Sequence, residues 1–215
     1  MLLNDVAVVI FGASLTYILG TSRLGAYVKI LSVQGVLLFF SAISHAETLG
    51  FFHSVFIAFE TLIVKATIIP LFIFFIIKDL GINREVEAYI DNFISVIVAI
   101  LIVIGSFTVA AIMKNVGQDS NIDVLTMGVS ISAVIIGLFI MISRKKLITH
   151  VMGYLVLENG IFLLSLALAT DVPIIVEMGV LLDVFIGLFL MGIFINRIQS
   201  TFDSADISEL TRLTD

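Results

Sequence analysis

The stretch Val151-Met-Gly-Tyr-Leu-Val-Leu-Glu-Asn-Gly-Ile-Phe-Leu-Leu164 decides the fold, because it places Glu158 and Asn159 in the middle of a long apolar run. A run of about 20 apolar residues is long enough to cross a bilayer as a helix. A carboxylate at the centre of such a helix costs about 2.5 kcal/mol or more to insert, so it is generally kept for a function. The next run, 172–195, carries a second acid, Asp183, at a similar depth. These two acids are the centre of the functional interpretation.

The composition excludes a water-soluble fold. Hydrophobic residues make up 60% of the 215 residues and charged residues 13%, whereas a soluble domain carries about 25% charged residues. The absence of cysteine excludes disulfides and thiolate-bound iron–sulfur clusters within this chain. Three scattered histidines do not form a metal motif, so no cofactor is expected in this chain. With 11 basic residues and a net charge of −6, no nucleic-acid binding is expected.

Seven apolar runs are candidates for membrane spans. They cover residues 1–20, 27–44, 51–77, 92–113, 122–142, 147–169 and 172–195. We therefore predict an all-α polytopic membrane protein with about seven transmembrane helices. The third run contains Pro70, which is expected to kink the helix and to free a backbone carbonyl for water. Whether this run is one helix or two stays open.

The loops divide the chain into three predicted regions. Residues 1–121 form a four-helix membrane region with a charged loop at 78–91, which suits an interfacial helix or an ordered loop. Residues 122–197 form a three-helix membrane region, and residues 198–215 form an acidic tail.

The basic residues predict an orientation in the cell membrane. With seven spans, one side of the membrane receives nine lysines and arginines and the other side receives Lys114. The nine are Arg23, Lys29, Lys78, Arg84, Arg144, Lys145, Lys146, Arg197 and Arg212. Because basic loops stay in the cytoplasm, we expect a multi-pass protein of the cytoplasmic membrane with the N-terminus outside and the C-terminus inside.

Glu158 and Asp183 suit a proton relay. Two acids at similar depth that exchange protons through water are the simplest form of such a path. Asn159 and the small residues Gly160 and Gly187 would leave room for water or for close helix approach. The structural alternative is that each acid bonds a neighbouring helix and holds the assembly together.

Lys65 is a third charged position inside the membrane, and Glu60 precedes it by five residues. In an α-helix that spacing corresponds to about 140° around the axis, so the two are not expected to pair as i,i+4 residues do. Each is expected to find a partner on another helix or subunit. We predict that Lys65 and Glu60 belong to a proton path with Glu158 and Asp183. Lys65 is then either a proton switch or a fixed counter-ion of Glu158 or Glu60.

Three further polar residues have supporting roles. His150 lies at the cytoplasmic entrance below Glu158, where it is a proton-entry or an interface residue. Glu177 lies about one turn inside the outer end of its run, within reach of lipid headgroups. Gln34, near the centre of the second run, is expected to hold helices together.

Two segments resemble a known membrane subunit. The segment Gly153-Tyr-Leu-Val-Leu-Glu-Asn-Gly-Ile-Phe-Leu163 resembles the second helix of the K subunit of complex I and of its relatives in multisubunit cation/proton antiporters. Leu182-Asp-Val-Phe-Ile-Gly187 resembles the third helix of that subunit, with Asp183 in place of the more usual glutamate. Residues 122–197 would form this K-like unit. The whole chain, with its Leu157-Glu-Asn-Gly160 motif and its length, resembles the hydrogenase-4 component E family.

The resemblance implies a non-catalytic subunit of a group 4 nickel–iron hydrogenase or formate hydrogenlyase type of oxidoreductase complex. The nickel–iron centre and the iron–sulfur clusters would lie in a cytoplasmic arm, and antiporter-like membrane subunits would be neighbours. Glu158 and Asp183 would belong to the proton or sodium path. Alternatives are a subunit of a multisubunit cation/proton antiporter, a stand-alone small-ion transporter, or a structural anchor whose buried charges only fix packing.

Overall fold

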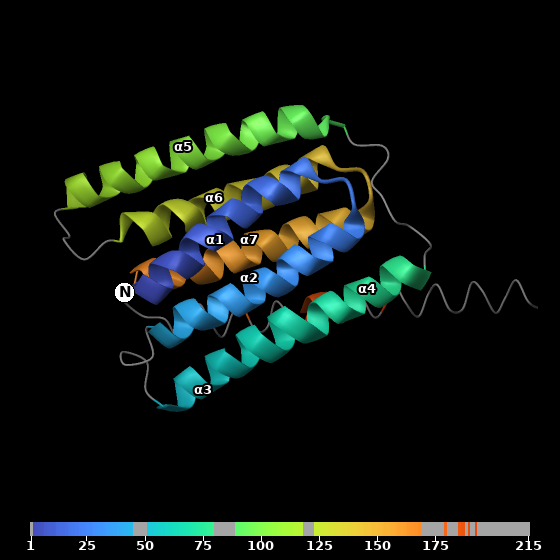
Figure 1. The fold of residues 1–215 in the computed structure, drawn as a ribbon, viewed down its shortest axis with the longest axis horizontal. Helices are drawn as coiled ribbons and strands as arrows, with labels where there is room; N and C mark the ends of the chain where they lie inside the picture. The colour runs from blue at the N-terminus through green and yellow to red at the C-terminus, as the bar shows by residue number, and fades with distance from the viewer. Residues whose placement is uncertain are drawn as a thin grey trace, which may run out of the picture. The chain divides into compact units, whose positions relative to one another are not determined.

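The computed structural model describes residues 2–44, 51–79, 89–117 and 123–168, and isolated positions at 179, 185–187, 189 and 192. The chain divides into two units, 1–180 and 181–215, and the fold described below is that of the first. Its elements are α1 (Leu2–Gly20), α2 (Leu24–Ser44), α3 (Phe51–Phe59), η1 (Glu60–Ile68), α4 (Ile69–Asp79), α5 (Asn92–Gly117), α6 (Val124–Ser143) and α7 (Leu147–Leu168). Figure 1 shows them as nearly parallel rods.

The described helices confirm an all-α, multi-pass membrane protein. Six segments are long and apolar enough to cross a bilayer, and α3, η1 and α4 join into one of them, Ser54–Asp79. The third apolar run is therefore continuous, but its middle third is a π-helix. The seventh predicted run, 172–195, lies outside the described residues except at isolated positions.

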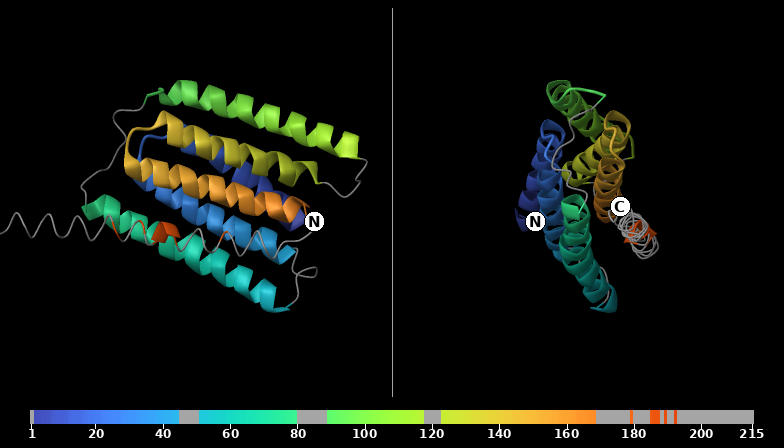
Figure 2. Two further views of the ribbon diagram at one scale, coloured as in Figure 1. Left: turned by 180° about the vertical axis from the view of Figure 1, so that it is seen from behind. Right: turned by 90° about the vertical axis from the view of Figure 1, so that its right-hand side faces the viewer.

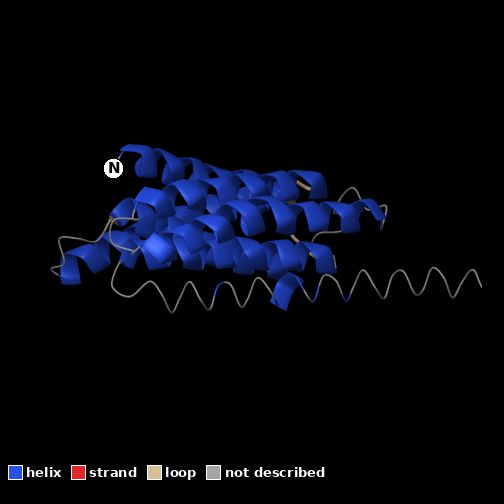
Figure 3. Cartoon of the chain, turned by 90° about the horizontal axis from the view of Figure 1, so that it is seen from below, coloured by secondary structure: helices blue, strands red, loops and turns tan. Residues whose placement is uncertain are grey.

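Four helices form a ring at the centre of the first unit. In order around the ring, α1 packs on α2, α2 on α7, α7 on α6 and α6 on α1. α5 covers the α1–α6 edge, whereas the α3–η1–α4 rod covers α2 on the opposite edge (Figures 1 and 2). The view from below in Figure 3 shows the same bundle of aligned helices.

Burial differs between the central and the edge helices. Two thirds of the α7 span is buried, against 17% of the α5 span. The α5 side chains that remain exposed are large and apolar, such as Ile97, Leu101 and Ile104. In a bilayer such a surface faces lipid or a partner helix at no hydration cost, so α5 is a peripheral helix and α7 is the core.

Small residues let α6 and α7 approach closely. A Cβ at Gly137 would lie 2.6 Å from the backbone nitrogen of Leu157, and one at Gly160 would lie 2.8 Å from the backbone nitrogen of Val134. Membrane helices associate through such contacts because lipid supplies no hydrophobic drive between them. This tight contact holds the helix that carries Glu158. The expectation that Gly160 permits close helix approach is therefore confirmed.

Arg144 is buried, although the sequence places it in a basic cluster at the membrane surface. Its side chain is 1% exposed, and it donates from Nη1 to Asn92 Oδ1 at 3.0 Å and from Nη2 to the Leu19 carbonyl at 3.2 Å. Arg144 thus joins the end of α1, the start of α5 and the end of α6. Its neighbour Lys145 is exposed and lies over the ring of Tyr89, with Nζ 5.1 Å from the centroid.

Candidate functional site

The π-helix η1 holds two of the predicted site residues. Its hydrogen bonds run from residue i to residue i−5, as in the bond from the Ile69 N–H to the Val64 carbonyl. Nine residues in this register is long, since π segments usually occupy a single turn and often mark functional sites. Pro70, which has no N–H, lies two residues beyond the end of η1. The π segment thus ends just before this proline.

The carbonyl of Ala66, four residues before Pro70, is bonded from a neighbouring helix. The hydroxyl of Ser32 on α2 donates to this carbonyl at 2.8 Å. The bond forms where α2 packs directly on η1. This hydrogen bond fixes the π segment against the central ring. That Pro70 frees a backbone carbonyl for water stays a prediction.

Lys65 forms an ion pair with two carboxylates. Its Nζ donates to Glu158 Oε1 on α7 and lies 3.5 Å from Glu60 Oε1 on its own helix. The residues are buried, with 5%, 3% and 2% of their surface exposed for Lys65, Glu158 and Glu60. We call Glu60, Lys65 and Glu158 the ion triad.

The argument against a Glu60–Lys65 pair was wrong because it assumed α-helical geometry. In a π-helix the i→i+5 hydrogen-bond pattern brings residues five apart onto one face of the helix. Of the two counter-ions left open for Lys65, the structure therefore supplies both. The Phe162 ring, one turn beyond Glu158 on α7, adds a third contact, with Lys65 Nζ 5.3 Å from its centroid.

A chain of polar contacts continues from the ion triad into the central ring. Asn159, next to Glu158, donates from Nδ2 to Gln34 Oε1 on α2 at 3.2 Å. Gln34 donates in turn from Nε2 to Ser14 Oγ on α1 at 2.9 Å. Gln34 is fully buried, and it links α1, α2 and α7. The expectation that Gln34 holds helices together is confirmed.

A glycine and a small cavity set the spacing around the ion triad. A Cβ at Gly35 would lie 2.6 Å from the backbone nitrogen of Ala66, so α2 and η1 meet backbone to backbone beside Lys65. A cavity of about 10 Å³ lies between Lys65, Glu158 and Asn159. That volume is at the lower limit for one water molecule. The role of Gly35 was not predicted from the sequence, although the small residues beside Gln34 and Lys65 could have indicated it.

Of the three remaining predicted residues, His150 lies within the described part of the chain. His150 is half-buried near the start of α7, and its Nδ1 donates to the Lys146 carbonyl at 2.8 Å, since a carbonyl can only accept. Eight residues separate it from Glu158, or about 12 Å along the helix. Asp183 and Glu177 lie outside the described residues. Gly179 is described, and a Cβ there would lie 3.3 Å from Glu158 Oε1.

Metal binding has no support in the described part of the chain. No group of three histidine, aspartate or glutamate side chains is placed there to hold an ion. The carboxylates of the ion triad instead face an ammonium group, which is the arrangement expected for buried charge. The site thus brings two carboxylates and one ammonium group, all of them groups that can bind or release a proton, to one buried position.

The fold and the site together define a multi-pass helical membrane protein with a buried carboxylate–lysine cluster. Hydrogenase-4 component E of Escherichia coli strain K12 is 22% identical over 152 residues, which cover 70% of this chain and 69% of that protein. An uncharacterized protein of Mycobacterium tuberculosis is 26% identical over 133 residues, which cover 62% of this chain and 60% of that protein. No protein-family profile matches, and no solved structure matches.

Proposed function

We propose that this chain is a membrane subunit of a complex I-related respiratory or hydrogenase complex, and that the ion triad is part of its proton or sodium path. The observation that carries the proposal is the burial of Lys65 between two carboxylates from different parts of the chain. The similarity to hydrogenase-4 component E supports the kind of complex. In that complex the chain would not itself be the catalytic subunit.

Charge balance makes the ion triad an exchange site. With all three groups ionised their formal charges sum to −1, and a net charge at membrane depth is costly. One additional proton, or one passing cation, makes the triad neutral. The triad therefore favours a state with one such ion bound, and it can return the ion when the surroundings supply a different counter-charge.

The position of Lys65 selects which acid holds the exchangeable proton. When its ammonium group lies closer to Glu158, as in the described state, Glu60 is the acid favoured to take up a proton. When it moves toward Glu60, which is 3.5 Å away in the described state, Glu158 becomes the acid that takes up the proton. A shift of one flexible side chain thus transfers proton affinity from η1 to α7, a step along the membrane plane.

The polar chain beyond Glu158 has a positioning role in this proposal. The amides of Asn159 and Gln34 donate and accept hydrogen bonds but do not change protonation state. They hold α7 next to α2, and the small cavity beside Asn159 would place one water molecule in contact with Glu158. Asp183 would continue the path on the following helix, and His150 would supply it from the cytoplasm.

The arrangement in the membrane follows from the same proposal. The ends of α1, α4 and α6 and the starts of α2, α5 and α7 gather at one side of the described spans, since consecutive spans alternate in direction (Figure 1). This side carries Arg23, Lys78 and Lys145, and the other carries Lys114. We assign the first side to the cytoplasm. A nickel–iron and iron–sulfur arm would dock there, and antiporter-like subunits would flank the bundle.

The test combines purification with a conservative substitution. The tagged chain, purified from native membranes, should bring antiporter-like subunits and a redox arm, identified by mass spectrometry. Glu158→Gln keeps an acceptor for Lys65 but cannot exchange a proton. In sealed vesicles it should leave the assembled complex intact and lower ion translocation per electron at least about 10-fold. Asp79→Asn, the same change at an exposed acid, is the matched control.

Two outcomes would contradict the proposal. Recovery of the chain alone, as a monomer or homo-oligomer, would exclude the complex and favour a stand-alone transporter. Undiminished ion translocation in Glu158→Gln would remove the ion triad from the path and leave it with a packing role.

A further inference from the structure

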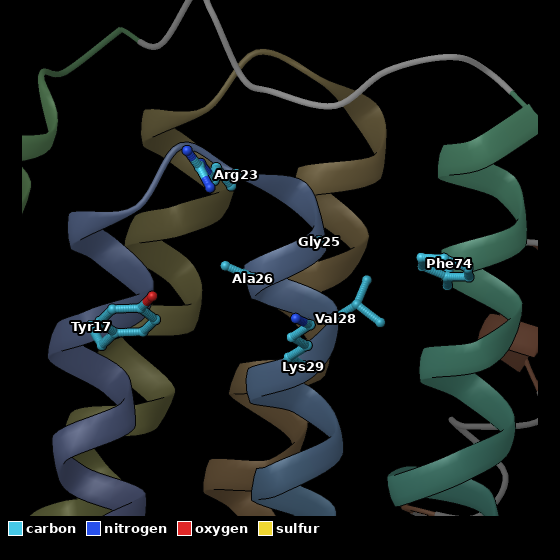
Figure 4. Close-up of a pocket in the computed structure, with 7 residues that line it drawn as sticks. All are labelled: Tyr17, Arg23, Gly25, Ala26, Val28, Lys29 and Phe74. Carbon is cyan, nitrogen blue, oxygen red and sulfur yellow. The ribbon is translucent and has the colours of Figure 1, made fainter.

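A second candidate site lies on the exposed side of α2, apart from the ion triad. It is a cavity of about 610 Å³, within the usual range of about 300–1,000 Å³ for small-molecule sites. Its lining residues are Tyr17, Arg23, Gly25, Ala26, Val28, Lys29 and Phe74. Figure 4 shows that they come from α1, from the start of α2 and from α4. We call this cavity the α2 groove.

The shape of the α2 groove follows from the size of its residues. Gly25 and Ala26 form a low floor on α2, and a Cβ added at Gly25 would meet no atom within 4 Å. Tyr17 and Phe74 stand on the neighbouring helices on either side (Figure 4), with 62% and 49% of their surface exposed. Two apolar walls and an open floor make a channel that can take an elongated apolar chain.

Two basic side chains line the α2 groove. Arg23 and Lys29 are both exposed, and they are six residues apart, or about 9 Å along the helix. The residues that line the groove include no acid within the described part of the chain. The backbone of Arg23 is fixed at the start of α2. Its backbone N–H donates to Thr21 Oγ1 at 3.2 Å, and its backbone carbonyl accepts from the Ala26 N–H at 3.0 Å.

The depth of these cations matches the headgroup layer. Lys29 is the sixth residue of α2, so its Cα lies about 8 Å from that of the first helical residue, and its long side chain can extend back toward the surface. The headgroup layer is about 5–8 Å thick on each side of a bilayer. A guanidinium and an ammonium at this depth, above apolar walls, would lie within reach of lipid phosphates.

We propose that the α2 groove binds one anionic phospholipid, whose phosphate lies between Arg23 and Lys29. The planar guanidinium of Arg23 can bond two phosphate oxygens, and Lys29 adds a point charge. An acyl chain would follow Tyr17, Val28 and Phe74 toward the bilayer centre. A headgroup with a net negative charge is favoured because no acid in the groove is placed to pair with a choline or ethanolamine cation. Basic pockets between membrane helices bind lipid headgroups in this way.

The test measures lipid binding to the intact chain in detergent by native mass spectrometry. Phosphatidylglycerol and phosphatidylcholine with the same acyl chains are added in parallel, and inorganic phosphate is a third arm. The first phosphatidylglycerol should bind about 25-fold more tightly than phosphatidylcholine, since each basic side chain near an anionic lipid contributes about five-fold. Inorganic phosphate at millimolar concentration should not displace it.

Three variants separate charge from shape. Arg23→Gln with Lys29→Gln should reduce phosphatidylglycerol affinity to that of phosphatidylcholine. Gly25→Leu, which fills the floor and changes no charge, should weaken both lipids. Lys114→Gln, which removes an exposed basic residue at the end of α5, should leave the difference between the lipids unchanged.

Several results would overturn the proposal. Equal affinity for the two lipids in the wild type would exclude headgroup recognition. Full phosphatidylglycerol binding in both the double variant and Gly25→Leu would place the lipid elsewhere. Displacement by inorganic phosphate would identify a free-anion site rather than a lipid site. None of these outcomes depends on the ion triad, because binding is measured without ion transport.

Discussion

Replacing Gly35 with alanine tests the contact that brings α2 and η1 together. A Cβ at position 35 would lie 2.6 Å from the backbone nitrogen of Ala66 and 2.7 Å from its Cα. Since ordinary contacts between such atoms are about 3.5 Å or longer, the two backbones would have to separate by roughly 0.8–0.9 Å. Neither atom belongs to a side chain that can rotate away, so one whole helix must move.

The size of the effect follows from this displacement. One extra methyl group in a well-packed site costs about 1–3 kcal/mol, partly offset by about 0.5–1 kcal/mol because alanine is a better helix former than glycine. Gly105→Ala is the matched control, since its Cβ in the middle of α5 would meet nothing within 4 Å. Subtracting the control removes the helix-propensity term, and the remaining difference corresponds to roughly 2–12 °C in unfolding temperature for a chain of this size.

The assay is loss of helical circular dichroism on heating, with all variants in the same detergent. The unfolding temperature of Gly35→Ala should be roughly 2–12 °C lower than that of Gly105→Ala. It should also impair ion translocation in the assembled complex, because Lys65 is adjacent to Ala66 and a shift of about 1 Å at a reacting group can cost about 100-fold in rate. Equal unfolding temperatures for the two variants would refute a backbone-to-backbone contact between α2 and η1.

Three further substitutions test other contacts. Arg144→Ala removes two charge-assisted hydrogen bonds, worth about 1.5–3 kcal/mol each, and should lower the unfolding temperature by several degrees. Lys145→Gln should leave the unfolding temperature unchanged, and equal effects of the two variants would contradict the role of Arg144 in joining α1, α5 and α6. Ser32→Ala should destabilise the protein by about 0.5–1.5 kcal/mol, because it removes the hydroxyl that donates to the Ala66 carbonyl; an unchanged unfolding temperature would refute the link between α2 and η1. Asn159→Leu leaves the buried side-chain oxygen of Gln34 on α2 without its donor, which should cost about 1–3 kcal/mol of stability. Backbone amide hydrogen exchange in α2 should therefore become faster, and unchanged protection would argue against the link between α7 and α2.

The membrane fold could be predicted from the sequence because apolar length alone decides it. Each of the six described spans coincides with a predicted run. Capping is also local: Asp123, at the start of α6, accepts from the Leu125 N–H at 3.0 Å. Features of this kind depend on neighbouring residues in the chain, so a pattern in one segment suffices.

The candidate site could be predicted in part. Buried Glu158 and Lys65 stand out because charge is rare at membrane depth, and Glu158 and Glu60 were both left open as partners of Lys65. The geometry of the Glu60 pair could not be predicted, because a periodicity of 3.6 residues places Glu60 on another face of the helix, and no propensity in the sequence predicts a nine-residue π segment. The proton-path roles of Glu60, Lys65, Glu158 and Asp183 stay predictions.

Long-range packing was beyond the reach of the sequence. Arg144 lies in a run of three basic residues, and such runs are usually solvated, yet the carbonyl of Leu19 is 125 residues away along the chain and accepts from it. Gly35 and Ala66 are also unremarkable in isolation. Only the placement of α2 beside η1 turns them into a contact that positions Lys65.

The π-helix implies a spacing rule that a search for helical periodicity does not reveal. Glu60, Lys65 and Pro70 follow one another at intervals of five residues. An acid, a lysine and a proline at these intervals within an apolar run form a pattern that can be searched for in a sequence. In this chain the π-helical hydrogen bonding ends just before the proline and brings the acid and the lysine onto one face of the helix. Other membrane proteins with this pattern are candidates for the same intrahelical ion pair, and an alignment that inserts or deletes one residue between these positions would indicate that the pair has been lost.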